Sequence, residues 1–484
     1  MTRMTPALSL LALVMACGPK SGDLPKDTSW RTQQPQPLAP REFQLPEAKS
    51  ATLSNGVQVS VVENHEMPLV NVRVAFDQGS WTDDSASIGL ASVTMDMLNE
   101  GAGDLDAAGI SKAAKAIAAN LSSGAGSDSA NVSVDVLTKN LEPALDLLAL
   151  VILKPTFEGD DWSLMKKDRV ADLASAKNNP SSIAGRVAGQ LQFGDQYKGH
   201  LRTEAAYEAM TTDQMREWWS AHITAGNARI YVGGDTSLEA VMPLLEARFG
   251  GWAGPTSDAP KPSAVKENVA TTTIFLVDKP GAPQSVLKVF RRLELKPQDA
   301  DWFDAYMANM MYGGLFSARL NLNLREDKGW TYGARSSLSS DYTKAIWTAS
   351  TSVKTDTSAD SISEILREVS EASAERTFTK DELENARGYL LGSRPVRYEN
   401  AGTLLGELQS NWLYGLPADW ITAYADKIRG VTIEGAQAAW DKHLKESPLS
   451  ILVVGDKSTI LESLQALGLP IVELDSDGKA VETK

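Results

Sequence analysis

Hydrophobic and polar residues alternate in two stretches near the start of the folded part of the chain, at residues 57–61 and 70–76. A period of two is typical of strands that bury one face, so we predict a strand in each stretch. The segment 283–290 repeats the pattern of 68–75, because both are alternating runs that follow a proline turn. The same strand is therefore predicted in each half of the sequence.

A longer pattern recurs at an interval of 221 residues. The sequence Trp-x-x-His, an apolar strand that ends in Gly-Asp, and then an amphipathic helix are found from residue 219 and again from residue 440. Self-similarity on this scale predicts two homologous domains. Because strands cluster at the ends of each half and helical patterns lie between them, we expect an α+β fold. Each domain would have a mostly antiparallel sheet with helices packed on one face.

The chain has 484 residues, which is too long for a single core, and changes in composition mark its segments. Residues 18–46 are rich in Pro, Gln, Ser and Asp without apolar periodicity, and residues 254–266 are also poor in apolar residues. We therefore predict a signal peptide at 1–16, a disordered tether at 17–48, an N-terminal domain at 49–253, a linker at 254–268, a C-terminal domain at 269–470 and a tail at 471–484.

The formal net charge is −15, and 43% of the residues are hydrophobic. No basic patch stands out in the sequence. This composition is that of a globular protein, and it argues against a nucleic acid or an anionic lipid surface as the partner.

The N-terminus has the pattern of an export signal, with Arg3 before an apolar run at 7–16 that is too short to span a bilayer. The run ends in Val-Met-Ala followed by Cys17, which resembles a bacterial lipobox, so we expect Cys17 to carry a lipid. An ordinary signal peptide with an incidental cysteine is the alternative. Gly18 and Pro19 differ from an inner-membrane retention signal, so we expect an outer-membrane lipoprotein that faces the periplasm.

Residues 88–101 predict an amphipathic helix with an unusual polar side. Ser92, Met95 and Asp96 share one side, opposite the apolar residues, because positions i, i+3 and i+4 lie together. The segment resembles the zinc-binding helix of the insulinase/pitrilysin peptidases, the inverzincins, which reads Gly-Leu-Ala-His-x-x-Glu-His-Met-Leu. The resemblance places two zinc ligands and the general base at these three positions. Since a thioether cannot abstract a proton and serine is a poor zinc ligand, we expect no zinc on this chain.

The resemblance also implies a third zinc ligand, a glutamate on a later helix, and the matching position here is Asp172. Asp96 and Asp172 together could form a weak oxygen-rich cation site; the simpler alternative is two solvated helix carboxylates. A zinc site built from histidines is not predicted, because no two of the four are spaced i, i+3 or i+4. These histidines are His65, His200, His222 and His443.

The second half contains a segment, residues 311–334, that closely resembles the C-terminal-domain segment of the same family. The resemblance implies that Arg325 and Tyr332, seven residues apart, project toward zinc and substrate, where they can hydrogen-bond a peptide backbone and a developing oxyanion. Gly313 and Gly314 would permit close backbone approach to the substrate. The alternative is a buried structural tyrosine beside an arginine salt bridge.

A degenerate first half and an intact Arg–Tyr pair resemble the non-zinc subunit of heterodimeric bacterial members of the family, with a fold like that of the mitochondrial processing peptidase. This resemblance implies a zinc-bearing paralogous partner and peptide substrates. The main alternative is a non-enzymatic structural or peptide-binding scaffold, as in the core subunits of respiratory complexes. An independent hydrolase that uses Asp96 and Asp172 is a third hypothesis.

Overall fold

The structure is a computed structural model that describes residues 43–194, 198–257, 261, 266–341 and 343–481. The predicted signal peptide, Cys17 and most of the predicted tether lie outside the described residues. From Gln44 onward the chain forms one unit, which contains both halves of the repeat. Within the described ranges, none of the helices combines the length and the apolar character needed to cross a membrane.

The first half is built on a six-stranded sheet with the order β1-β2-β8-β3-β7-β6. Strands β2 and β8 are parallel, and the other neighbours in this sheet are antiparallel. The strands are β1 (Ala48–Thr52), β2 (Gln58–Glu63), β3 (Leu69–Phe76), β6 (Asn120–Ala125), β7 (Ala130–Leu137) and β8 (Ala228–Gly234), and a small separate pair is formed by β4 (Gly101–Ala102) and β5 (Leu105–Asp106).

The second half repeats this arrangement in a six-stranded sheet with the order β11-β12-β10-β13-β9-β14. Strands β9, β13, β10, β12 and β11 take the places of β2, β8, β3, β7 and β6, and β9 and β13 are again parallel. The predicted α+β fold with two homologous, mostly antiparallel sheets is confirmed. The strands are β9 (Thr273–Asp278), β10 (Gln284–Arg292), β11 (Thr331–Ser340), β12 (Ala345–Lys354), β13 (Ser450–Gly455) and β14 (Ile471–Leu474).

The two sheets differ in the strand at one edge. In the first sheet β1 precedes β2 in the chain and runs antiparallel to it. In the second sheet the equivalent edge is β14, which comes from the end of the chain and pairs in parallel with β9. Residues 471–474, which the sequence predicts to be part of a tail, are therefore part of the sheet.

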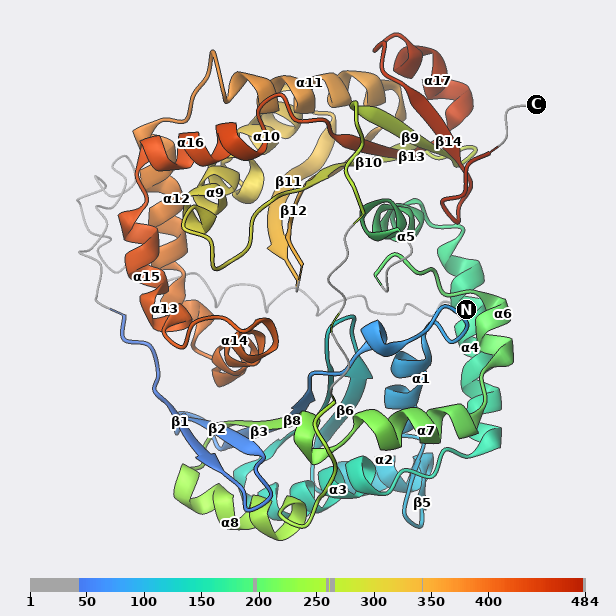
Figure 1. Ribbon diagram of the computed structural model, residues 1–484, viewed down its shortest axis with the longest axis vertical. Helices are drawn as coiled ribbons and strands as arrows, with labels where there is room; N and C mark the ends of the chain where they lie inside the picture. Colours follow the sequence, from blue (N-terminus) through green and yellow to red (C-terminus); the bar gives the residue numbers. More distant parts are fainter. Residues whose placement is uncertain (1–42, 195–197, 258–260, 262–265, 342, 482–484) are drawn as a thin grey trace, which may run out of the picture. The chain divides into compact units, whose positions relative to one another are not determined.

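Helices of each half cover one face of its own sheet, as Figure 1 shows for α3 and α8 in the first half and α11 and α17 in the second. The helices of the first half are α1 (Leu90–Met97), α2 (Ala107–Ala116), α3 (Leu141–Leu153), α4 (Gly159–Ala176), α5 (Pro180–Phe193), α6 (Glu204–Ala209), α7 (Thr212–His222) and α8 (Leu238–Phe249). Those of the second half are α9 (Trp302–Asn309), α10 (Arg319–Asn321), α11 (Ser358–Glu371), α12 (Lys380–Gly392), α13 (Arg394–Arg397), α14 (Ala401–Tyr414), α15 (Trp420–Gly430), α16 (Ile433–His443) and α17 (Lys457–Gln465).

Alternation along the strands separates two apolar layers. In β3, Val72 and Val74 join the large core of the first half, and in β10, Leu287 and Val289 join that of the second. The neighbouring side chains point to the opposite face of each sheet, because successive residues of a strand alternate. That opposite face is covered in each half by a helix from the other half.

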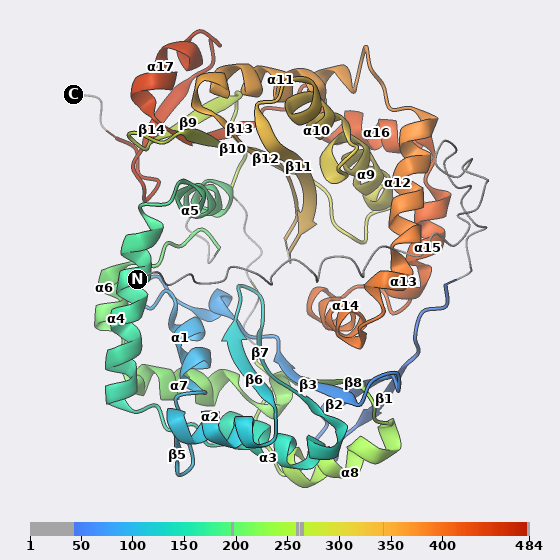
Figure 2. The same cartoon turned by 180° about the vertical axis from the view of Figure 1, so that it is seen from behind.

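Helix α5 of the first half packs on the second sheet. Its apolar side chains, with Ile183 and Val187 at the centre, form a third core together with Val286 of β10 and Leu452 of β13. Arg186 also forms an ion pair with Asp477 at 2.9 Å. The contact of α5 with β10 and β13 is visible in both views (Figures 1 and 2).

Helix α14 of the second half packs on the first sheet in the same way. A side chain at Gly233 of β8 would approach Leu405 to 2.9 Å, so glycine permits the close contact. The Arg229 guanidinium lies 4.9 Å from the centre of the Trp412 ring. Helices α5 and α14 both have 14 residues, begin after an asparagine cap and are separated by the repeat interval, so equivalent helices are exchanged between the halves.

Candidate functional site

The helix with the degenerate zinc motif, α1, is shorter at both ends than the predicted 88–101, and a carboxylate fixes its start. The Asp83 side chain accepts hydrogen bonds from the backbone N–H groups of Gly89 and Ala91, at 2.8 and 2.9 Å. Burial raises the pKa of Asp83 to about 6, against the opposing effect of these N–H donors. The first turn is thus held in place by a buried acid.

Met95, at the position of the family's general base, is fully buried in the first core. The prediction that it lies on an outward side with Ser92 and Asp96 is wrong. The reason is that α1 packs against both α7 and β6, and the Ser123 hydroxyl of β6 donates a 2.6 Å hydrogen bond to the Met95 carbonyl. Both sides of this turn of the helix are therefore covered by protein.

Asp96, at the second expected histidine position, forms an ion pair with Arg169 of α4, with 2.5 Å between Nη2 and Oδ2. The Asp96 side chain is only 23% exposed, so it is not the freely solvated carboxylate of the simpler prediction. Burial raises its pKa, and the charges of Arg169 and Arg202 act against that rise. A guanidinium therefore uses the carboxylate that a metal ion would need.

Asp172 lies three residues beyond Arg169 on the same helix and is exposed. Across the residues that the structure describes, no three His, Cys, Asp or Glu side chains are grouped closely enough to hold a metal ion. A hydroxyl, a buried thioether, a paired carboxylate and an exposed carboxylate do not match the nitrogen and oxygen donors of a catalytic zinc site. The residues at Ser92, Met95, Asp96 and Asp172 therefore do not fit zinc.

A cavity of about 380 Å³ lies beside this motif, and its charged lining is mainly basic. Arg169, Arg202 and Lys198 line it together with Asp172. Sequence reasoning missed the two arginines, although the spacing of Arg169 and Asp172 places both on one side of α4. The excess of positive charge disfavours a bound cation, which also argues against a cation site at the two predicted aspartates.

Arg325 lies in the second of two π-helical turns, at 310–314 and 322–327. Its guanidinium is 4.5 Å from the centre of the Phe316 ring, and Arg335 approaches the same ring at 5.4 Å. Arg325 also pairs with the neighbouring Glu326 at 3.4 Å. Short π-helical turns are frequent at functional sites, and here they present an arginine on an exposed aromatic ring.

Tyr332 is the second residue of β11, and its side chain is 90% exposed. The register with β12 shifts between Thr331 and Ala334, and the Thr331 hydroxyl accepts a hydrogen bond from the Gly333 N–H at 3.0 Å. A bulge of this kind redirects a side chain away from the sheet. The alternative of a buried tyrosine beside an arginine salt bridge is therefore contradicted, because Tyr332 points into solvent.

Gly313 and Gly314 permit a close approach, but the approaching groups belong to the protein itself. A Cβ atom at Gly313 would lie 2.6 Å from the hydroxyl oxygen of Ser336 on β11, and one at Gly314 would lie 2.6 Å from the Met310 sulfur. Gly313 thus lets the first π-helical turn pack against β11, the strand that carries Tyr332, and Gly314 leaves room for the Met310 side chain of the same turn. Their predicted contact with substrate stays a prediction.

The two repeated histidines lie at the ends of α7 and α16. His222 pairs through Nδ1 with the Gln78 side chain at 3.0 Å, and His443 pairs through Nε2 with Asp301 at 2.9 Å. Burial lowers the pKa of His222. Both histidines connect a helix end to a loop of their own half, which is a structural role.

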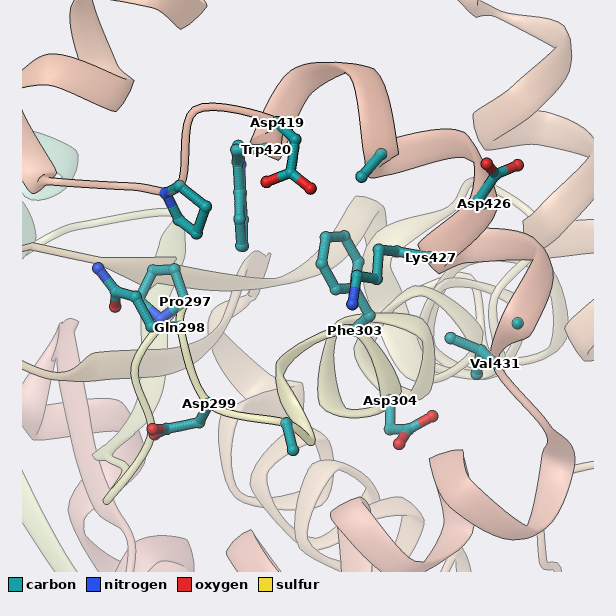
Figure 3. Close-up of a pocket in the computed structure, with 14 residues that line it drawn as sticks. Pro297, Gln298, Asp299, Phe303, Asp304, Asp419, Trp420, Asp426, Lys427 and Val431 are labelled. Atoms are coloured by element: carbon teal, nitrogen blue, oxygen red, sulfur yellow. The ribbon is translucent and has the colours of Figure 1, made fainter.

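A further cavity of about 390 Å³ lies in the second half, between the loop before α9 and helix α15 (Figure 3). Phe303 and Trp420 form part of its wall, and their rings are 5.2 Å apart. Several aspartates surround it, among them Asp304 and Asp426. Neither Arg325 nor Tyr332 contributes to this lining.

Comparison with known families gives two matches to one family. The family described as insulinase (peptidase family M16) matches residues 58–187, and the peptidase M16 inactive domain matches residues 209–390. Together these matches span most of the chain. The chain belongs to the insulinase family of peptidases.

Individual relatives agree with this assignment. The chain is 21% identical to the non-peptidase homolog YmxG of Helicobacter pylori, over 83% of this chain and 93% of that protein. A peptidase M16 inactive domain from Pseudomonas fluorescens superimposes with a TM-score of 0.76 at 24% identity, over 85% of this chain and 98% of that one. The periplasmic protease PqqL from Escherichia coli gives 0.72 at 15% identity, over 89% of this chain but 50% of that protein. With its zinc ligands replaced, this chain is an inactive homologue of the family.

Proposed function

We propose that this chain is the non-catalytic subunit of a heteromeric insulinase-like zinc peptidase. In this proposal Arg325 and Tyr332 contact the substrate and the transition state at the zinc site of a partner chain. The observation that carries the proposal is the 90% exposure of Tyr332 on the bulge of β11. An exposed phenol is available to a site that the chain itself does not complete.

The zinc would come from a paralogous partner with an intact His-x-x-Glu-His helix. In the first half the positions of the zinc motif are taken up by a buried methionine and by the Asp96–Arg169 ion pair. This chain also spans half the length of PqqL. A protease of that length has room for two such units in one polypeptide, which supports a second chain of the same kind here.

The chemistry of the pair suits peptide hydrolysis. A guanidinium offers two parallel N–H donors to a substrate carbonyl or carboxylate, and a phenol offers one O–H donor to the oxyanion that forms during attack. Neither group needs to change its protonation state for this role. The substrates would be peptides, which the partner's zinc site cleaves for degradation or processing.

The proposed location is the periplasmic side of the outer membrane, with a lipid on Cys17. The replacement Cys17→Ser should release the protein into the soluble fraction or leave it unprocessed, since the lipid is the proposed anchor. Fractionation of cells and mass analysis of the N-terminus test this. A Cys17→Ser chain that is processed and stays on the membrane like the natural one would contradict it.

The first experiment on function is affinity purification from native membranes, with mass spectrometry of the partners. The recovered pair is then reconstituted and assayed for peptide cleavage with Tyr332→Phe and Arg325→Ala. Loss of a donor to an oxyanion should lower the turnover rate by about 10²–10³-fold. Loss of a contact to the substrate backbone should cost about fivefold.

Tyr389→Phe is the matched control, because Tyr389 is also exposed, at 58%, but lies on α12. It should leave the rate unchanged. Turnover at the natural rate with both Tyr332→Phe and Arg325→Ala, in complexes with unchanged melting curves, would remove the catalytic-subunit proposal. The alternative of a structural or peptide-binding scaffold would then stand.

A further inference from the structure

A second cavity of the second half, of about 230 Å³, has aromatic side chains along much of its lining. It lies among helices α9, α13, α14 and α15, and none of its lining residues belongs to the Arg325–Tyr332 site. The aromatic residues around it are Trp302, Phe303, Tyr306, Tyr398, Trp420 and Tyr424. Its volume is below the roughly 300–1,000 Å³ of pockets for drug-sized ligands, so it has room for about one large side chain.

The aromatic walls are fixed before any ligand arrives. The Phe303 ring is 5.2 Å from that of Trp420 and 5.9 Å from that of Tyr424. The Tyr398 hydroxyl donates a 2.6 Å hydrogen bond to Glu407. Burial raises the pKa of both Tyr398 and Tyr424, so both phenols are neutral at neutral pH. A rigid aromatic wall loses little conformational entropy when a ring binds against it.

The charged groups of this cavity have an excess of positive charge. Arg394 is only 6% exposed, and its guanidinium lies 5.3 Å from the ring centres of both Tyr398 and Tyr424. Arg397 forms an ion pair with Glu407 at 3.3 Å. Two guanidiniums and one carboxylate therefore line the cavity, and this balance favours an anionic ligand.

The acidic cavity of Figure 3 adjoins the aromatic cavity, because Phe303 and Trp420 line both spaces. Its aspartates, Asp304 and Asp426 among them, would repel a carboxylate. Charge thus favours binding of an aromatic anion in the cavity lined by arginines over the cavity lined by aspartates.

We propose that the aromatic cavity binds the C-terminal residue of a peptide when that residue is aromatic. The ring packs against Trp420 and Phe303, and the terminal carboxylate receives charge-assisted hydrogen bonds from the arginines. The proposal needs neither zinc nor a partner chain, so it is tested on this chain alone and independently of the proposed function.

The test is a ligand-observed NMR titration of the full chain with N-acetyl-L-phenylalanine, its carboxamide and N-acetylglycine. We expect saturable binding of the acid, at least tenfold weaker binding of the carboxamide and no saturation with N-acetylglycine. This comparison requires no substitution. Equal affinity for the acid and the carboxamide, or no saturation with either, would overturn the proposal.

Substitutions then locate the site. Trp420→Leu removes a wall and should weaken binding of the acid at least fivefold, and Arg397→Gln, at a 54% exposed side chain, at least threefold. Asp426→Asn in the neighbouring cavity is the control and should leave the affinity unchanged. Natural affinity in both Trp420→Leu and Arg397→Gln would place the ligand elsewhere and overturn the assignment.

Discussion

The two halves of the chain share a sheet order, but they differ in the burial of the residues that the family motif assigns to zinc and substrate. In the first half, the helix α1 is enclosed, with Met95 in the core and Asp96 held by Arg169. In the second half, two π-helical turns and a bulge leave Tyr332 90% exposed.

This difference distinguishes residues that are kept for core packing from residues that packing does not explain. The first half keeps the motif helix as a packed element after its reactive groups are gone, because α1 still contributes Leu90, Val93 and Met97 to the core. The second half keeps features that packing does not require, such as a large exposed phenol. Exposed aromatic groups on a soluble surface are the ones that call for a functional explanation.

The largest expected effect on stability comes from replacing the repeated tryptophans, Trp219 and Trp440. Trp440 is 2% exposed and contacts Tyr312 and Trp347, whereas Trp219 is only half-buried. Trp440→Ala should lower the free energy of unfolding by about 4 kcal/mol and Trp219→Ala by about 2 kcal/mol. Urea unfolding of both variants measures this. Equal losses would show that the two aromatic clusters are equally packed despite the difference in exposure.

Rebuilding the zinc motif should fail for a structural reason. In the triple variant Ser92→His, Met95→Glu, Asp96→His, the new glutamate would be buried at the fully enclosed position 95, which should cost on the order of 3 kcal/mol. Arg169 would still lie beside the site. We expect no stoichiometric zinc by elemental analysis and a lower melting temperature. One tightly bound zinc per chain, with the natural melting temperature, is the contrary result.

Asp83 predicts a dependence of stability on pH. Its folded-state pKa of about 6 lies above the ordinary 3.8, so its contribution to stability is complete below pH 4 and is lost as the pH rises through 6. The group should lower the free energy of unfolding by about 2 kcal/mol across that range. Asp83→Asn should flatten this part of the pH profile of urea unfolding.

The second half supplies the control for this pH effect. Burial would raise the pKa of Asp301, but its hydrogen bonds with Lys442 and His443 lower it overall. Its contribution is therefore present above pH 4 and is lost as the pH falls. Asp301→Asn should leave the slope between pH 4 and 6 unchanged, and a flattened slope in this variant would contradict the assignment to Asp83.

The smallest expected effect on stability comes from replacing one arginine of each half in the isolated chain. Arg169→Gln leaves the partly buried Asp96 without its partner and should cost about 1 kcal/mol. Arg325→Ala removes a cation from the exposed ring of Phe316 and should change stability by less than about 0.5 kcal/mol. Thermal unfolding of the two variants measures both changes. A larger loss of stability with Arg325→Ala than with Arg169→Gln would make Arg325 a structural residue.

Local patterns predicted the strands and the repeat well, because alternation and turn residues act within a few positions of each other. The runs at 57–61, 70–76 and 283–290 lie within β2, β3 and β10 apart from an end residue or two. The burial of Met95 was missed, since helical periodicity indicates one buried side and cannot show that β6 and α7 cover another. The short strand at 471–474 has too few residues for its alternation to be distinguished from a tail.

Contacts between segments that are distant in the chain could also not be predicted from local sequence patterns. The partner of Asp96 is 73 residues away, and nothing local indicates that α4 brings Arg169 to it. The exposure of Tyr332 depends on a register shift between two strands, which no pattern within β11 reveals. The spacing of Arg325 and Tyr332 was informative only through its resemblance to a family.

The exchange of α5 and α14 gives the chain the topology of a domain-swapped dimer joined into one polypeptide. Each half lends the other an equivalent helix, so neither sheet can bury both faces with its own residues. A single backbone cut between the halves would therefore leave two fragments that stay associated, because α5 packs on the second sheet and α14 packs on the first. A chain nicked there by a protease would stay folded and associated until denaturant separated the two fragments. Neither fragment would then refold alone.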